Sequence, residues 1–120
     1  GADIMTSRRF RKEKPDLARR FMMAIVEGIH MARTQKDRAL RMISRQLKEN
    51  DPRILEAQYR TFVIDTFPTK PYPDEVTVRF SLEELDREFP GAKEKNPSQF
   101  IDASLLKGID QSGFIDKLYK

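Results

Sequence analysis

The sequence contains no cysteine and only one histidine, His30. Without thiols the chain can form neither a disulfide nor a thiolate-ligated zinc site. One histidine with no cysteine or second histidine cannot supply an ordinary zinc site, and no Ser–His–acid spacing accompanies it. We therefore expect no metal site and no catalytic residues, and we predict a structural or solvent-facing role for His30.

Glycine is also scarce, and the five glycines form neither a GxGxxG nor a Walker pattern. Such loops bring the backbone close to phosphate groups, so nucleotide binding has no local support. We expect no cofactor. Gly28 falls on the main apolar face of a predicted helix, where it would allow a neighbouring helix to pack closely.

Long apolar runs are missing as well, and no segment approaches the length that crosses a bilayer. Residues 1–14 are polar and basic and lack the apolar region of a signal peptide. We interpret the start at Gly1 as that of a processed piece. The 120 residues, 38% hydrophobic and 35% charged, are typical of one folded domain or a large piece of one.

The charge is unevenly distributed along the chain. Residues 1–48 carry 13 basic and five acidic residues, whereas residues 49–120 carry 10 basic and 14 acidic residues. This basic half leaves open a free-standing helical module that binds nucleic acid or an acidic protein. No zinc-finger, RNP or homeodomain pattern accompanies it, and aromatic residues are not interleaved with the charges. We therefore favour a solvated face or protein contacts and expect no nucleic acid.

The apolar pattern predicts a mainly α fold with a short N-terminal extended segment, in a single helical fragment over 1–120. Residues 1–14 are expected to be an extended, hinge-like lead-in. Three helices follow over 15–67, then a proline-rich loop over 68–74, then further helices and a C-terminal tail over 75–120. Capping residues and prolines mark the expected helix ends: Pro15, Asp51-Pro52, Asn96-Pro97 and Gly113.

The first predicted helix has apolar residues on more than half of its circumference. The main apolar face comprises Leu17, Phe21, Ala24, Ile25, Gly28, Met31 and Ala32. A second stripe on the other side comprises Met22, Val26 and Ile29. A helix of this kind is expected to be buried on two sides.

The segment after the proline-rich loop fits two structures. Val76, Val78 and Phe80 alternate like a strand, yet the spacing from Val78 through Leu82 is also helical. We predict a helix over 75–88, with a capping box formed by Ser81 and Glu84. Its acidic residues are interpreted as a solvated face rather than as catalytic carboxylates: Glu83, Glu84, Asp86 and Glu88.

Several short motifs, taken in order, resemble a stretch found in bacterial solute-binding proteins. They are Ser7-Arg8-Arg9-Phe10, Glu13-Lys14-Pro15-Asp16, FMMAIVEG at 21–28, Asp51-Pro52, Lys70-Pro71-Tyr72-Pro73, NPSQFID at 96–102, SLLK at 104–107 and SGFIDKLY at 112–119. The sequence is similar to the nitrate/sulfonate/taurine and thiamine-precursor group of these proteins, which serve ABC importers. The similarity spans essentially the whole chain.

The resemblance implies the helical C-terminal segment of a type 2 periplasmic binding protein, whose two α/β lobes clamp a small solute. It implies a periplasmic parent protein and a structural role without enzymatic activity. The implied partners are the missing N-terminal lobes, an ABC permease and, with the full protein only, a small organic or anionic solute. Thr6 and Ser7, near the implied hinge strand, are weak candidates for ligand binding. We also expect the excess apolar surface to favour self-association.

Overall fold

The computed structural model describes residues 4–120, and these residues are helical with no β-strand. The mainly α prediction is confirmed. Seven α-helices, one π-helix (η1) and two 3-10 helices (η2, η3) follow one another along the described chain. They are α1 Arg8–Glu13, α2 Pro15–Thr34, α3 Lys36–Leu47, α4 Pro52–Tyr59, η1 Arg60–Asp65, α5 Glu75–Leu85, η2 Ala92–Glu94, η3 Pro97–Phe100, α6 Ser104–Gln111 and α7 Phe114–Leu118.

The extended lead-in predicted for residues 1–14 is shorter than expected. Residues 4–7 have no regular structure, but α1 begins at Arg8. The Ser7 side chain accepts a hydrogen bond from the Phe10 amide at 3.0 Å, so it caps the first turn of this helix. The capping signal therefore outweighs the strand-like pattern of the apolar residues. Residues 1–3 lie outside the described residues.

The predicted turn residues mark the ends of the other helices. Pro15 and Pro52 occupy the first helical positions of α2 and α4. Asp51 accepts a hydrogen bond from the Arg53 amide at 2.9 Å, and Asn96 accepts one from the Ser98 amide at 3.1 Å. Gly113 has a φ of +81°, the left-handed conformation that ends α6. These short-range signals were sufficient to place the helices.

The segment from 75 to 85 is helix α5, as predicted, but the expected capping box is wrong. Asp74 caps the helix by accepting a hydrogen bond from the Thr77 amide at 2.8 Å. Ser81 lies inside the helix and donates to the Thr77 carbonyl. A capping side chain accepts a hydrogen bond from one of the unpaired amides at a helix N-terminus. In the middle of a helix the amides are already bonded to carbonyls of the same helix.

The third predicted helix changes its winding at Arg60, where α4 continues as the π-helix η1. Arg33 of α2 lies beside the end of η1. Its Nη1 atom donates to the carbonyls of Val63, Ile64 and Phe67 at 3.1, 3.3 and 2.8 Å. A helix end leaves carbonyls without partners, and Arg33 bonds two carbonyls of η1 together with that of Phe67 in the segment that follows. This one guanidinium group therefore ties α2 to the start of the proline-rich loop.

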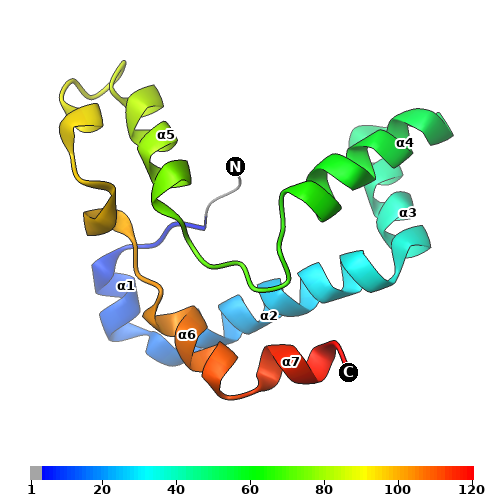
Figure 1. Ribbon diagram of the computed structural model, residues 1–120, viewed down its shortest axis with the longest axis horizontal. Helices are drawn as coiled ribbons and strands as arrows, with labels where there is room; N and C mark the ends of the chain where they lie inside the picture. The colour runs from blue at the N-terminus through cyan, green and yellow to red at the C-terminus, as the bar shows by residue number, and fades with distance from the viewer. Residues whose placement is uncertain (1–3) are drawn as a thin grey trace.

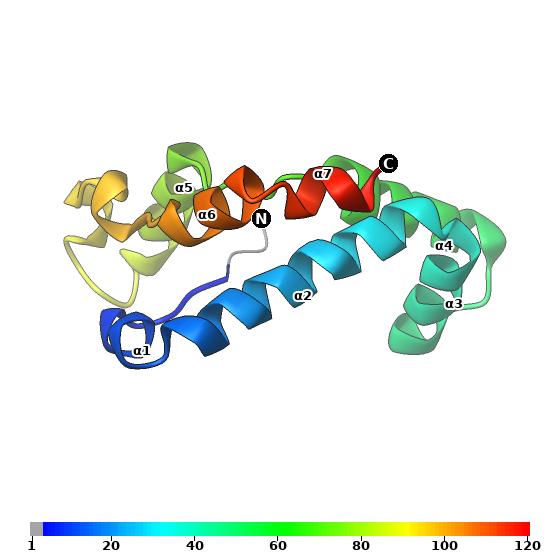
Figure 2. The same cartoon turned by 90° about the horizontal axis from the view of Figure 1, so that it is seen from below.

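The helices form a base with two arms, as Figure 1 shows. We call α2, α6 and α7 the base; Figure 2 shows α6 and α7 lying over α2. The α3 arm comprises residues 36–65, and the α5 arm comprises residues 75–100. The molecule measures 43 × 38 × 21 Å, so it is flat and open. Among the described helices, α5 packs only against η2 and η3.

The main core lies in the base, between α2, α6 and α7. Its fully buried members are Val26, Leu106, Ile109 and Ile115, none more than 2% exposed. A second, smaller cluster joins α2 to the α3 arm around Ala39, Tyr59 and Val63. The Tyr59 hydroxyl donates to the Ala32 carbonyl at 3.1 Å, which fixes that arm on the end of α2.

The burial of α2 on two sides is not found in the described chain. The buried residues are Val26 and Ile29 of the second stripe, together with Ala18. On the main apolar face, Leu17 is 44% exposed and Phe21 is 54% exposed. The expected close packing at Gly28 is absent too, because a Cβ added there would meet no atom within 4 Å. In the described chain, α6 and α7 cover one side of α2 only.

Candidate functional site

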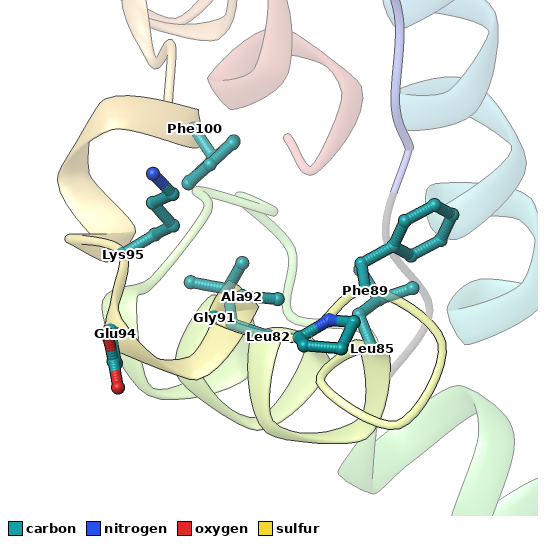
Figure 3. A pocket seen from close by; sticks show the side chains of 9 residues that line it. Leu82, Leu85, Phe89, Gly91, Ala92, Glu94, Lys95 and Phe100 are labelled. Carbon is teal, nitrogen blue, oxygen red and sulfur yellow. The ribbon is translucent and has the colours of Figure 1, made fainter.

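The α5 arm carries a hollow of about 540 Å³ between α5, η2 and η3 (Figure 3). Leu82 and Ala92 lie near its middle, Lys95 and Phe100 lie on one side, and Phe89 lies on the other. The complete lining is Leu82, Leu85, Phe89, Pro90, Gly91, Ala92, Glu94, Lys95 and Phe100. Most of these side chains are apolar, and we name this feature the α5 hollow.

The shape of the α5 hollow depends on the turn that follows α5. Gly91 has a φ of +92°, a left-handed conformation that disfavours residues with a Cβ. The Asp86 carboxylate accepts a hydrogen bond from the Gly91 amide at 2.8 Å and pairs with the Lys93 ammonium at 2.9 Å. The Lys93 hydrogen bond is the main cause that lowers the pKa of Asp86. The charged pair therefore holds the turn that forms one wall.

The chemistry of the α5 hollow suits apolar contact. Its only ionisable lining residues are Glu94 and Lys95, and both are exposed. Phe89 in its lining is 63% exposed, and elsewhere on α5 Val76 and Phe80 are 80% and 56% exposed. Such exposed apolar groups are typical of a surface that another protein segment covers. The arm can therefore receive apolar side chains from a second surface.

A polar cluster fixes the entry to the α5 arm. Lys70, in the proline-rich loop, pairs with Asp110 of α6 at 2.7 Å and with Asp116 of α7 at 3.0 Å. The Tyr72 hydroxyl donates to Asp110 at 2.7 Å. We name these four residues the Lys70 cluster. Hydrogen bonds from Lys70 and then Tyr72 lower the pKa of Asp110, and the bond to Asp110 raises the pKa of Tyr72. The pKa of Lys70 is raised chiefly by Asp110.

A second polar contact fixes the exit from the α5 arm. The Arg11 guanidinium of α1 pairs with Asp102 at 3.3 Å and donates to the Ser104 hydroxyl at 3.2 Å. Asp102 also accepts a hydrogen bond from the Ser104 amide at 2.9 Å. The Ser104 hydroxyl is the main cause that lowers the pKa of Asp102. The entry to the arm is therefore held to the base by ionic contacts, and the exit is held to α1.

The candidate residues predicted from the sequence do not come together. Ser7 serves as the cap of α1, and Thr6 is exposed in the segment before it. Neither residue lines the α5 hollow. His30 packs edge to face on Tyr119, with ring centroids 4.7 Å apart, which agrees with its predicted structural role. Among the described residues, no group of three or more His, Cys, Asp or Glu residues is placed to hold a metal ion.

The four acidic residues predicted to form a solvated face separate into two kinds. The helix ends at Leu85 rather than at 88, so Asp86 and Glu88 follow it. Asp86 is engaged with Lys93 and the Gly91 amide, whereas Glu83, Glu84 and Glu88 are exposed. The predicted solvated face therefore holds for the three glutamates, and Asp86 has a structural contact that the sequence did not indicate.

The residues that anchor the α5 arm are not evident from the sequence. Lys70 and Tyr72 lie 40 and 38 residues before their shared partner Asp110, and each is ordinary in its own context. In the structure the Tyr72 amide donates to the Lys70 carbonyl at 2.9 Å, so the two residues lie in a tight turn around Pro71. The prolines of this segment are the one local signal of such a turn.

Comparisons with protein-family models, with curated proteins and with solved structures found no match. No described helix combines the length and apolar character that a membrane crossing requires.

Proposed function

We propose that this chain is the C-terminal segment of the solute-binding component of a bacterial ABC importer of the nitrate/sulfonate/taurine or thiamine-precursor type. The support is the ordered series of motifs from Ser7 to Tyr119, which follows that family along essentially the whole chain. In this proposal the parent protein is periplasmic, and the segment has a scaffolding role without catalysis. It stabilises a lobe and contributes to the surface that meets the permease.

The observation that carries the scaffolding role is the distribution of exposed apolar residues. The uncovered side of α2 exposes Leu17 and Phe21, and α5 exposes Val76 and Phe80. An apolar helix face gains free energy when another element removes it from water. In the proposed parent, the N-terminal lobes supply that covering element. The exposed faces of α2 and α5 are where this proposal puts the contact with the rest of the protein.

The proposal is tested by fragment complementation. The chain alone, titrated calorimetrically with sulfonates, nitrate and pyrimidine precursors, is expected to show no binding. The upstream region of the same gene, expressed separately and mixed with the chain, is expected to recover binding of one of these solutes. Tight binding by the 120-residue chain alone contradicts the proposal. An upstream region that does not encode two α/β lobes contradicts it as well.

The variant that tests the contact in the complementation experiment is Phe21→Ser, on the uncovered side of α2. This side chain is 54% exposed in the chain alone, so the variant is expected to fold normally. In the mixture it is expected to weaken the recovered binding, because Phe21 then lies at the contact. Equal recovery by the variant and the unaltered chain counts against this face as the contact.

The alternative function is a free-standing basic module that binds nucleic acid or an acidic protein. The arrangement of the basic residues bears on the binding of nucleic acid. The basic residues of α1 and those of α3 lie at opposite ends of α2, a helix of 20 residues that is about 30 Å long. They do not form one continuous track for a nucleic-acid backbone. Retention of the chain on DNA or RNA at low salt, lost steeply as salt rises, would support that alternative.

A further inference from the structure

Helix α3 carries a stripe of basic residues along one exposed face. Arg38, Arg41 and Arg45 are spaced by three and four residues, so they lie above one another on the helix, and Lys48 follows as its C-cap residue. All four are exposed, whereas the opposite side of α3 places Ala39 in the second core cluster. We name these four residues the α3 stripe.

None of the four residues has an acidic partner within the described chain, where eight ion pairs engage other residues. The one side-chain contact of Arg38 is a donation to Gln35 at 3.5 Å. The neighbouring cation of α3, Lys36, is paired with Glu56 at 2.6 Å. The α3 stripe is therefore available to an external anion.

A hollow of about 430 Å³ lies beside the α3 stripe, between α3 and α4. Its lining consists of Leu40, Arg41, Ser44, Arg45 and Leu55. Two guanidinium groups of the stripe thus border an opening with leucines on its walls. This combination offers strong hydrogen-bond donors for carboxylates and, next to them, space for an apolar side chain.

We propose that the α3 stripe and this hollow form a docking surface for an acidic amphipathic helix of a partner protein. Carboxylates on successive turns of that helix pair with Arg38, Arg41 and Arg45. One apolar side chain of the same helix enters between Leu40 and Leu55. This is recognition of a helix by a groove, in which apolar burial supplies affinity and the charged pairs supply orientation and association rate.

The surroundings of the stripe favour a protein over a nucleic acid. The three arginines lie within about 10 Å along α3, which is short for a track of phosphates. The hollow has leucine walls and no aromatic residue on which a base would stack. The exposed residue next to Arg41 is Met42, 55% exposed, and methionine is common on surfaces that receive amphipathic helices.

This inference goes beyond the scaffolding role and does not depend on it. The apolar faces assigned to the N-terminal lobes belong to α2 and α5, whereas the docking surface belongs to α3 and α4. Failure of the complementation experiment leaves the docking surface untouched. Failure of the docking experiment likewise leaves the proposed parent protein untouched.

The experiment uses the full chain and a fluorescent synthetic helix that carries glutamates at i, i+3 and i+7 and one leucine beside them. Fluorescence anisotropy is expected to show binding that weakens by about tenfold or more in Arg41→Glu/Arg45→Glu. The matched control, Lys12→Glu/Lys14→Glu, makes the same charge change at the other end of α2 and is expected to bind as the unaltered chain does. Circular dichroism checks that both variants are folded.

Two altered probes separate the contributions of charge and of apolar burial. A peptide with glutamine in place of glutamate is expected to lose most of its binding. A peptide with serine in place of leucine is expected to bind several-fold more weakly, because the hollow is left unfilled. Equal binding by Arg41→Glu/Arg45→Glu and by the control variant overturns the proposal. A DNA duplex that binds the stripe more tightly than the acidic peptide at the same salt concentration overturns it in favour of a nucleic-acid surface.

Discussion

The base and the α5 arm cover their apolar side chains to different extents. In the base, Val26, Leu106, Ile109 and Ile115 are almost completely removed from water. In the α5 arm, Leu82 and Pro97 are buried, while Val76, Phe80 and Phe89 are more than half exposed. Helix–helix packing on α2 alone is enough to build the core of the base. The arm is stabilised by turns and ion pairs, and its apolar residues face outward.

Two side-chain truncations test the difference in burial between the base and the α5 arm. Ile109→Ala removes side-chain atoms from a fully buried site and is expected to lower the free energy of unfolding by about 2–5 kcal/mol. Phe80→Ala removes a side chain that is 56% exposed and is expected to change it by about 0.5 kcal/mol or less. Urea unfolding followed by circular dichroism measures both. Equal losses would mean that the exposed face of α5 is covered in the folded chain.

A second prediction concerns association of the isolated chain. We expect the exposed side of α5 to drive self-association, because burying a phenylalanine contributes about 1.5–3 kcal/mol. The variant Val76→Ser/Phe80→Ser is therefore expected to weaken association by at least about tenfold without changing the fold. Sedimentation or light scattering across a concentration series measures this. A monomer at high concentration of the unaltered chain would show that these side chains do not drive contact between copies.

A third prediction compares two glycines of the base. Gly28 is inside α2 with open space around it, so Gly28→Ala is expected to raise the free energy of unfolding by about 0.5–1 kcal/mol. Gly113 has a φ of +81°, so Gly113→Ala is expected to lower it by about 1–2 kcal/mol. Thermal unfolding distinguishes the two. A lower free energy of unfolding in Gly28→Ala would support the close packing at Gly28 that the sequence predicts.

The smallest expected effect is the pH dependence of the Lys70 cluster. The pKa of Asp110 is lowered in the folded state, chiefly by Lys70. Its contribution to stability is therefore present above the ordinary carboxyl pKa and is lost as the pH falls through the lowered value. Asp110→Asn is expected to make stability less dependent on pH below about pH 5. Lys70→Gln should produce the same flattening, and the double variant should add little to either.

The helix boundaries were predictable from the sequence because they depend on neighbouring residues. Pro15, Asp51 and Gly113 act within one turn of their own positions, so the local pattern identifies them. The same reasoning identifies Ser7 as a helix cap. The strand-like character of Ile4 and Phe10, however, favours an extended segment. Local signals in conflict need a tertiary contact to decide between them.

The buried side of α2 was not predictable, because apolar residues occur on both sides. Phe21 and Val26 are equally good core residues by type, and their neighbours decide which is covered. The same applies to Arg33 and Lys70, whose partners lie about 30 to 46 residues away along the chain. The α5 hollow also requires η2 and η3 to fold back on α5. None of these pairings leaves a signal at the position of either partner.

The single turn at Gly113 has a consequence for how two copies can exchange parts. Helix α7 is joined to α6 by one connection. Ile115 of α7 belongs to the main core, and Tyr119 packs against it. Opening one hinge lets α7 of one molecule take the same place in another, which is domain swapping. The α5 arm, tied by the Lys70 cluster at one end and by Arg11 at the other, requires two hinges to open together. A swapped dimer of this chain is therefore expected to exchange its C-terminal helix and to keep its arm.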